Sequence, residues 1–481
     1  MICIPLGDCV MQELLRNLRQ AAKTADLLEV RADTIPDFSL ARLLKHKINT
    51  PLIFTCYAKS NGGCFNGAES GRIALLSSAI SSGRFEYVTI DVPEELNISG
   101  DVKALIVLSR RLKSKVILAY HNYRRTPDNL DRVYKALSAY KPAAVKIVTY
   151  ARQFSDNFKI FKLAQKAAPR RGRELISFSM GDKGFISRIL YRKFGLFLTY
   201  ASYKTGWETA DGQIPLERIK YLYRADAIAR KTEIFGLLGN PIKHSRSPAV
   251  FNGLFKAENH NAVYLPFDIE PRYLNNDFRL IKSFLKPAGF SVTSPYKIRV
   301  MKLIDGLSKS AKEIGAVNTV YRQGGKYVGS NTDWIGVIEA LLPLRKLINR
   351  RQAFILGRGG ASRAIVYALR CSGIETLVFA RKSGGRILPL KRLPQYCHGP
   401  GTDKIIINAT PVGMFPDTNK SPVPKSCLKK GMIVFDTIYN PAETRLIKDA
   451  RSKGCFTVNG LRMFLTQGLK QMECFTRNLS R

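Results

Sequence analysis

Two pairs of residues in different halves of the chain have the types that proton transfer requires. Lys146 lies in the apolar run AAVKIV, and His121 ends the preceding run, KVILAYH. A lysine at the end of a buried strand loses hydration, which lowers its pKa and frees the amine to form an imine with a ketone. A histidine beside it can move the protons. Farther along, Lys297 and Asp333 would pair as a proton donor and the carboxylate that orients it.

Each of these residues also has an ordinary structural explanation. A strand-end lysine is most commonly a surface residue whose stem covers apolar atoms. A lone histidine is usually structural, and Lys297 with Asp333 would by themselves indicate a surface ion pair. We favour the chemical interpretation because His121 accompanies Lys146, and because further motifs surround Lys297.

The elements before residue 205 favour a (β/α)8 barrel. The segment contains eight apolar runs of strand length: ICIPL, LLEVR, PLIFTC, YVTID, KVILAY, AAVKIV, LISFSM and FLTYA. Amphipathic helical segments such as LDRVYKALSAY lie between most of them, as expected for parallel strands with crossover helices. Barrel sites are built where the strands end. The residues at these ends are Glu29, Arg31, Tyr57, Asp91, His121, Lys146 and Met180.

The second half is again α/β, and it contains a strand, a glycine-rich turn and a helix in AFILGRGGASRAIVYAL. Gly357, Gly359 and Gly360 would permit a tight turn, and a helix N-terminus binds phosphate. Where an NAD enzyme would show an acidic residue after the next strand, this chain has Arg381 and Lys382. Two cations at this position favour the extra phosphate of NADP.

Composition limits the partners and the compartment. The 77 Lys and Arg residues exceed the 37 Asp and Glu residues, for a formal charge of +40, but the clusters are short, such as Arg170, Arg171 and Arg173. We therefore expect small anionic substrates and no nucleic acid. Nine irregularly spaced cysteines predict free thiols, no metal site and a cytoplasmic location. The strand-like start MICIPLGD predicts no signal or transit peptide, and no apolar stretch is long enough to span a membrane.

Residues 1 to 228 resemble the type I 3-dehydroquinate dehydratases. The motifs are LLEVRAD, the H-x-x-x-x-TP that starts at His121, VKI, SMGDKGFISR and DGQI. The resemblance implies that Lys146 forms a Schiff base with the C3 ketone, that His121 abstracts the C2 proton, and that Arg188 binds the substrate carboxylate. It also implies a pocket formed by Glu29, Arg31, Met180 and Gln213. The chain departs from the family by having Tyr57 for an arginine, Asp91 for a glutamate and Thr209 for a serine, all at expected pocket positions.

Residues 233 to 481 resemble the shikimate dehydrogenases. The motifs are GNPIKHSRSP, SVTSPYK, GAVNT, NTDWIG, GRGGASRA, INATPVGM, FDTIYNP and NGLRMFLTQG. The resemblance implies Lys297 and Asp333 as the catalytic pair. The implied substrate contacts are Ser245, Ser247, Thr293, Asn318, Tyr439 and Gln467. The implied NADP contacts are Gly357, Arg358, Gly359, Gly360, Ala361, Arg381, Lys382, Thr410, Met414 and Gly460. Ser291 replaces a usual asparagine, and Arg358 occupies a position that is normally small.

The whole chain therefore resembles the bifunctional dehydratase/dehydrogenase enzymes of the shikimate pathway. We expect an α/β protein with a barrel over residues 1–230, a substrate-binding domain over 231–335 completed by a helix over 459–481, and a Rossmann-like NADP domain over 336–458. Two alternatives are quinate dehydrogenase activity in the second half and a quinate-sensing regulator. All four catalytic residues are present, which argues against the regulator, and Ser247 with Thr293 favours shikimate.

Overall fold

The structure, a computed structural model, describes residues 1–167, 174–348, 351–398 and 404–477. These residues form two compact units. The first contains Met1–Ile234, Arg246–Pro266 and Arg279–Leu285, and the second contains Phe235–Ser245, Phe267–Phe278 and the chain from Lys286 onward. The basic cluster of Arg170, Arg171 and Arg173 lies outside the described residues.

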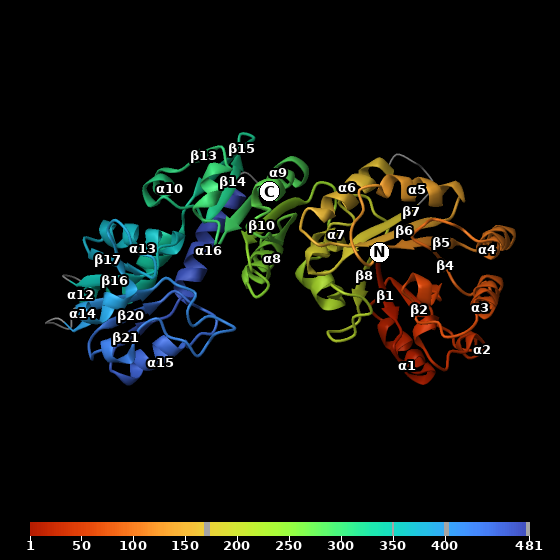
Figure 1. Cartoon of the computed structure of the whole chain (residues 1–481), viewed down its shortest axis with the longest axis horizontal. Coiled ribbons are helices and arrows are strands. Elements are labelled where there is room, and N and C mark those ends of the chain that lie inside the picture. Colours follow the sequence, from red (N-terminus) through yellow and green to blue (C-terminus); the bar gives the residue numbers. More distant parts are fainter. Residues whose placement is uncertain (168–173, 349–350, 399–403, 478–481) are drawn as a thin grey trace. The chain divides into compact units, whose positions relative to one another are not determined.

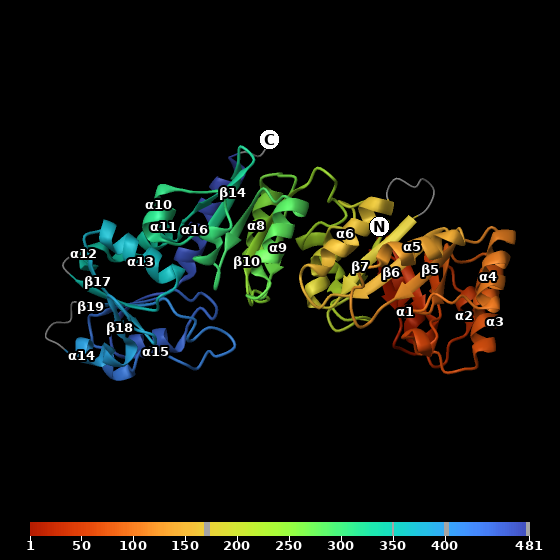
Figure 2. The same ribbon diagram turned by 45° about the horizontal axis from the view of Figure 1, so that its top comes forward.

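All eight predicted strands of the first unit are present in one curled parallel sheet (Figures 1 and 2). The strands are β1 (Ile2–Leu6), β2 (Leu27–Arg31), β3 (Leu52–Thr55), β4 (Tyr87–Val92), β5 (Val116–His121), β6 (Ala144–Tyr150), β7 (Glu174–Met180) and β8 (Thr199–Ser202), followed by the short β9 (Ile214–Pro215). Their order is β7-β6-β5-β4-β3-β2-β1-β8-β9. Phe197, two residues before β8, donates a backbone hydrogen bond of 2.9 Å to Leu175 O of β7, which closes the curled sheet into a barrel.

Helices follow most of these strands, because the parallel order requires crossovers. They are α1 (Met11–Ala21), α2 (Leu40–Leu44), α3 (Glu69–Ser81), α4 (Gly100–Arg111), α5 (Leu130–Ala139), α6 (Asp156–Ala167) and α7 (Phe185–Ile189). The unit also contains α8 (Ser247–Ala257) and most of β11 (Ala262–Asp268). Residues 279–285 join this unit through Phe284, whose ring stacks on Phe161 at 6.3 Å and on Phe194 at 5.8 Å.

The apolar periodicity of LERIKYLYRADAIARK, residues 216–231, predicts a long helix that closes the barrel domain, and this prediction is wrong. Only a wide helical turn forms, at Arg218–Leu222, and Arg224, two residues after its end, has a left-handed backbone at φ 48°. A residue with this backbone conformation cannot continue a right-handed helix. The apolar residues of the segment are nevertheless buried, among them Ile219, Tyr223 and Ile228.

The second unit contains two sheets. In the first, the strand order is β10 (Glu233–Gly239), β12 (Gly289–Val292), β14 (Thr319–Gln323), β15 (Lys326–Ser330) and β13 (Gly306–Leu307). The second is fully parallel in the order β18-β17-β16-β19-β20-β21. Its strands are β16 (Gln352–Leu356), β17 (Glu375–Ala380), β18 (Ile387–Pro389), β19 (Lys404–Asn408), β20 (Ile433–Asp436) and β21 (Phe456–Val458). From β16 the chain adds strands on one side of the sheet as far as β18, and then on the other side from β19 to β21. Dinucleotides bind at the carboxyl ends of the strands where the order switches in this way, here between β16 and β19.

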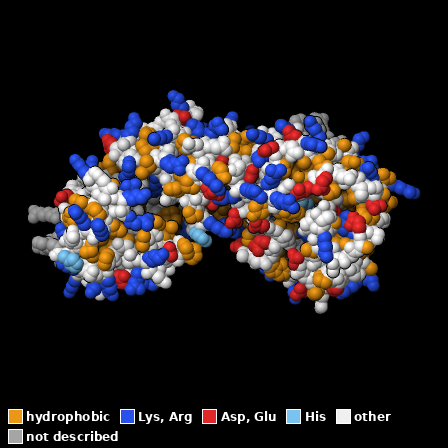
Figure 3. All heavy atoms as spheres, viewed as in Figure 1, with side chains coloured by type: hydrophobic (Ala, Val, Ile, Leu, Met, Phe, Trp, Pro, Cys, Tyr) orange, Lys and Arg blue, Asp and Glu red, His pale blue; other side chains and the backbone are white. Residues whose placement is uncertain are grey.

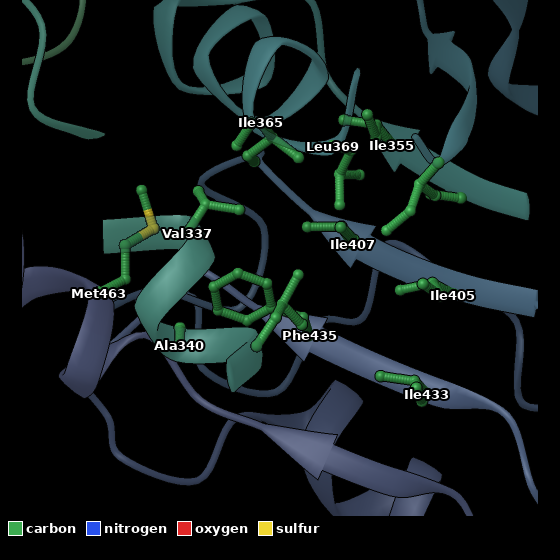
Figure 4. Close-up of a cluster of buried hydrophobic side chains, with 14 residues drawn as sticks. Val337, Ala340, Ile355, Ile365, Leu369, Ile405, Ile407, Ile433, Phe435 and Met463 are labelled. Atoms are coloured by element: carbon green, nitrogen blue, oxygen red, sulfur yellow. The ribbon is translucent and has the colours of Figure 1, made fainter. Parts of the chain in front are cut away.

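The helices of this unit are α9 (Leu274–Leu280), α10 (Lys309–Ile314), α11 (Asp333–Leu341), α12 (Arg345–Ile348), α13 (Gly360–Cys371), α14 (Leu393–Cys397), α15 (Arg445–Ser452) and α16 (Leu461–Thr476). Alternate residues of the parallel strands face opposite layers, because the side-chain period of a strand is two. Figure 4 shows one layer, in which Ile355, Ile407 and Phe435 pack against α11, α13 and α16. Phe354, Ile406 and Val434 face the other layer, which contains α14 and α15. The sheet is therefore covered on both faces.

All nine cysteines are free thiols, as expected. Within the described ranges, no helix has the length and apolarity needed to cross a membrane, and no group of three or more metal-ligating side chains occurs. Lys and Arg side chains are spread over the face shown in Figure 3.

Candidate active sites

Lys146 lies in the interior of the barrel with its amine surrounded by oxygen atoms. Its side chain is 5% exposed, and Nζ donates to the hydroxyls of Tyr57 at 3.1 Å and Tyr200 at 2.9 Å. The carboxylate of Glu29 lies 3.4 Å away. Burial lowers the pKa of Lys146, although the charge of Glu29 opposes this shift. A larger fraction of neutral amine is therefore present than for an exposed lysine, as imine formation requires.

His121 lies on the same face of the sheet as Lys146. Strand β6 pairs Lys146 with Ala119 of β5, and it pairs Val148 with His121, two residues farther along. The imidazole packs between Tyr57, at a centroid distance of 5.0 Å, and Tyr123, on which it stacks at 5.5 Å. Burial, together with the charges of Lys146 and Arg31, holds the pKa of His121 well below its usual value. Neutral imidazole near pH 7 is the form that acts as a base.

Arg188 on α7 is fully buried, and it has no carboxylate bonded to its guanidinium within the described chain. The guanidinium Cζ lies 4.3 Å from the centroid of the Phe178 ring. Nη2 donates to Asp211 O at 3.4 Å, whereas Nε has no acceptor among the described residues. Burial lowers the pKa of Arg188 to about 9. An anion that paired with this guanidinium would remove the penalty for burying the charge, so the geometry suits the carboxylate of a ligand.

Tyr57 and Asp91 are connected through the loop that follows β3. One oxygen of Asp91 accepts from Arg72 at 2.6 Å, and the other accepts from Ala58 N at 3.1 Å and from Asn61 at 2.7 Å. The carboxylate thus anchors the loop that presents Tyr57 to Lys146. The guanidinium of Arg31 packs on the ring of Tyr57, with Cζ 4.8 Å from the ring centroid.

The remaining predicted residues of the barrel occupy its carboxyl-terminal end. Met180 is buried at the end of β7. The backbone N–H and hydroxyl of Thr209 both donate to the side-chain oxygen of Gln213, at 2.7 and 3.3 Å. Sequence reasoning missed Tyr200, although it lies in the eighth apolar run, FLTYA, close to the end of the strand.

The predicted pair in the second unit is formed. Lys297 follows β12, Asp333 is the first residue of α11, and Nζ lies 2.5 Å from Oδ2. The lysine side chain is 17% exposed and the aspartate side chain 5% exposed, so the pair borders solvent while its carboxylate is enclosed. The side-chain oxygen of Asn331 accepts a hydrogen bond of 3.0 Å from Asp333 N, which fixes the backbone at the start of α11.

Asn318 holds the carboxylate of this pair in position. Its amide nitrogen donates to Asp333 Oδ1 at 2.9 Å and approaches Gln467 Oε1 at 3.2 Å. Its oxygen accepts from Thr319 at 2.7 Å and from the backbone of Thr332 at 2.8 Å. Asn318 is buried, and its amide is fully engaged within the protein.

The other predicted substrate residues come from several elements. Ser245 lies in a turn in which its N–H donates to Ile242 O at 3.0 Å, and Ser247 is the first residue of α8. Thr293 packs against Gly239, where an added Cβ would lie 2.3 Å from its methyl group. Ser291, the departure from the family pattern, is buried and donates to Gln471 at 2.7 Å.

The glycine-rich turn has the backbone that a dinucleotide requires. Gly357 has φ 115°, a region that L-residues avoid, and a Cβ there would lie 3.0 Å from Ala409 O. Gly359 precedes α13, and a Cβ on it would meet nothing within 4 Å, so its backbone is open to a ligand. Ala361 lies in the first turn of α13. Arg358, Arg381 and Lys382 are exposed, and Arg358 donates to Lys382 O at 3.4 Å.

The residues expected at the nicotinamide side, and Tyr439 of the expected substrate contacts, follow β19, β20 and β21. The Thr410 hydroxyl donates to Asn408 at 2.7 Å. Met414 is 46% exposed, the ring of Tyr439 stacks on Phe464 at 4.2 Å, and Gly460 lies so close to Thr437 O that a Cβ would clash at 2.1 Å. Burial raises the pKa of neighbouring Asp436 to about 6, despite its bonds to Asn408 and Thr444.

Comparisons with known proteins identify both halves. The model of type I 3-dehydroquinase matches residues 2–230, and the model of the shikimate dehydrogenase substrate binding domain matches residues 237–320. A bifunctional 3-dehydroquinate dehydratase/shikimate dehydrogenase of Arabidopsis thaliana, described as chloroplastic, is 31% identical over 99% of this chain and 82% of its own length. A shikimate dehydrogenase (NADP(+)) of Caldanaerobacter subterraneus is 41% identical over 49% of this chain and 89% of its own. The crystal structure of shikimate dehydrogenase 1 from Peptoclostridium difficile is 36% identical over 52% of this chain and 93% of its own, with a TM-score of 0.47.

Proposed function

Because the chain belongs to the family of bifunctional 3-dehydroquinate dehydratase/shikimate dehydrogenases, we propose that the residues described above form its two successive active sites. The chain dehydrates 3-dehydroquinate to 3-dehydroshikimate and reduces this product to shikimate with NADPH. Both substrates are small anions. The observation that carries the assignment of residues is the enclosed amine of Lys146, which has oxygen atoms within 3.4 Å and the imidazole of His121 on the same face of the sheet.

In the first site, the neutral amine of Lys146 attacks the C3 ketone and forms an imine. The imine withdraws electrons from C2, and the neutral imidazole of His121 takes the C2 proton. The elimination of water then gives 3-dehydroshikimate after hydrolysis of the imine. Arg188 holds the substrate carboxylate, since its buried guanidinium has an unused donor. Glu29 and Gln213 would orient the hydroxyls.

In the second site, Lys297 donates the proton that the ketone oxygen gains during reduction, and Asp333 keeps the ammonium charged and in place. The turn at Gly357 and Gly359 fits a dinucleotide phosphate, and Arg381 with Lys382 would bind the additional phosphate of NADP. NADPH supplies the hydride when bound. Thr410, Met414 and Gly460 would lie at its nicotinamide end.

Four further residues would bind the substrate of the second site. Ser245 and Ser247 would bind the substrate carboxylate, and Thr293 and Gln467 its hydroxyls. Asn318 is expected from the sequence to contact a substrate hydroxyl; because its amide is engaged within the protein, we propose instead that it holds Asp333 in place. A quinate-sensing regulator and a quinate dehydrogenase are not favoured, because the relatives of both halves carry the names of shikimate pathway enzymes.

We also propose that the dehydratase domain covers 1–230, that the substrate domain covers 231–335 together with the C-terminal helix from 459, and that the NADP domain covers 336–458. A fragment of residues 231–481 should then reduce 3-dehydroshikimate; a folded but inactive fragment would contradict this division. We propose a cytoplasmic location, supported by nine free thiols, which a reducing compartment preserves. Fractionation of the producing cell tests it.

Borohydride reduction tests the first site. Borohydride added with 3-dehydroquinate should trap a covalent adduct, and peptide mass analysis should place it on Lys146. The Lys146→Ala variant should not be labelled, whereas the Lys297→Ala variant should label like the wild type, because its substitution lies in the other unit. Equal labelling of wild type and Lys146→Ala would show that another amine forms the imine.

A further inference from the structure

Tyr200 connects the reactive amine of the barrel to a carboxylate through two hydrogen bonds. Lys146 Nζ donates to the Tyr200 hydroxyl at 2.9 Å, and the same hydroxyl donates to Glu29 Oε1 at 3.3 Å. Lys146, Tyr200 and Glu29 are all buried. A proton that leaves the amine therefore starts in a nearly dry environment, and it needs an acceptor within the protein.

We propose that Tyr200 is a further catalytic residue of the dehydratase, which conducts a proton from Lys146 to Glu29 and so frees the amine for attack on the ketone. This inference rests on the proposed function of the first site. The direct contact between Lys146 and Glu29 is longer, at 3.4 Å, so the hydroxyl provides the better-connected path.

Two protons move in this step, and the phenol is regenerated. An N–H bond of the Lys146 ammonium breaks while its proton bonds to the Tyr200 oxygen, and the Tyr200 O–H proton bonds to Glu29. The products are a neutral amine, an intact phenol and a protonated carboxyl group. The amine then forms the C–N bond with the ketone. The proton held by Glu29 is later transferred to the hydroxyl group of the carbinolamine, which leaves as water. All protons of the sequence of steps are then accounted for.

The surroundings favour a phenol rather than a phenolate as the carrier. Burial raises the pKa of Tyr200 well above its usual value, and the negative charge of Glu29 raises it further. Thr55 donates to the same Glu29 oxygen at 2.8 Å, which holds the acceptor in place. The titratable groups around the amine come from the elements β1, β2, β5, β8 and the loop after β3: Cys3, Glu29, Arg31, His121, Tyr200 and Tyr57.

Tyr57 provides a matched comparison. Like the Tyr200 hydroxyl, the Tyr57 hydroxyl accepts a hydrogen bond from Lys146, at 3.1 Å. The hydrogen bond that continues to Glu29 is donated by Tyr200. Removal of either hydroxyl takes one hydrogen bond from the amine, but removal of the Tyr200 hydroxyl also interrupts the path. Tyr134 of α5 serves as a folding control, because its buried hydroxyl has no partner among the described residues.

The test is the single-turnover rate of imine formation, measured by rapid quenching with borohydride from pH 6 to pH 9. In Tyr200→Phe the rate should fall about 100-fold at pH 6, a typical effect of lost proton transfer. The deficit should disappear toward pH 9, where more of the amine is already neutral. Tyr57→Phe should show a loss that does not depend on pH, and Tyr134→Phe should match the wild type.

A pH-independent deficit in Tyr200→Phe, or none, would overturn the relay. If that variant does not fold, the wild type decides the question: the imine-formation rate in mixtures of H₂O and D₂O should curve with the deuterium fraction, because two protons move together. A linear dependence would overturn the proposal. Failure of the proposed function itself would look different, since the wild type would then form no adduct on Lys146 at any pH.

Discussion

Gly360, the first residue of the helix after the dinucleotide turn, lies directly against Lys297 of the catalytic pair. A Cβ added at Gly360 would lie 2.6 Å from Lys297 Cβ and 3.0 Å from its Cδ. The absence of a side chain therefore lets the start of α13 approach the proton donor. Through this contact, the element that would bind the cofactor phosphates also sets the position of the lysine.

Gly360→Ala should damage the reductase alone. The clash must be relieved by moving α13 or Lys297, and overpacking of this kind costs about 1 to 3 kcal/mol. We expect a reduction in kcat/KM for NADPH and 3-dehydroshikimate of about 10- to 100-fold, measured by steady-state kinetics. Dehydratase activity, in the other unit, should be unchanged.

Gly253→Ala in α8 is the control for this substitution, because a Cβ there meets nothing within 4 Å. If Gly360→Ala reduced 3-dehydroshikimate as fast as the wild type, the contact with Lys297 would have no functional importance.

Lys297 and Asp333 should behave as one catalytic unit. Lys297→Ala should lower turnover by about 10²- to 10⁴-fold, with a much smaller change in shikimate affinity measured by calorimetry. The double variant with Asp333→Asn should be little worse than Lys297→Ala alone, because the aspartate acts through the lysine. Multiplicative losses, or loss of shikimate binding in Lys297→Ala, would make Lys297 a binding residue.

Cofactor preference should depend on Arg381. A charge-assisted hydrogen bond to phosphate contributes about 1.5 to 3 kcal/mol, so Arg381→Ala should raise the KM for NADPH about 10- to 100-fold and leave the KM for NADH nearly constant. Arg370→Ala is the matched control, since Arg370 is also exposed but lies in the last turn of α13. An unchanged preference in Arg381→Ala would assign the extra phosphate to other residues.

The eight barrel strands could be predicted because each is a short apolar run, buried on both faces of a parallel sheet. The helix expected at 216–231 failed because local periodicity does not reveal a left-handed residue such as Arg224. Tyr200 was missed for a related reason. A tyrosine in an apolar strand suggests packing, and only the closed barrel brings its hydroxyl to Lys146, 54 residues earlier in the chain.

Other contacts of the site are equally hidden in the sequence. The hydrogen bond from Asn318 to Asp333 joins the residue before β14 to the first residue of α11, and Gln467, which Asn318 also contacts, lies 149 residues farther along the chain. The motifs identify these residues as important, but a motif does not distinguish a group that contacts substrate from one that positions its neighbour.

The most direct test of the two-site account is NADPH oxidation started with 3-dehydroquinate. The wild-type chain should oxidise NADPH from this substrate. Lys146→Ala should fail with 3-dehydroquinate yet react normally with 3-dehydroshikimate, Lys297→Ala should fail with both, and an equimolar mixture of the two variants should recover oxidation from 3-dehydroquinate. If the wild type oxidises NADPH only when 3-dehydroshikimate is supplied, the barrel is not a working dehydratase and the central claim is wrong.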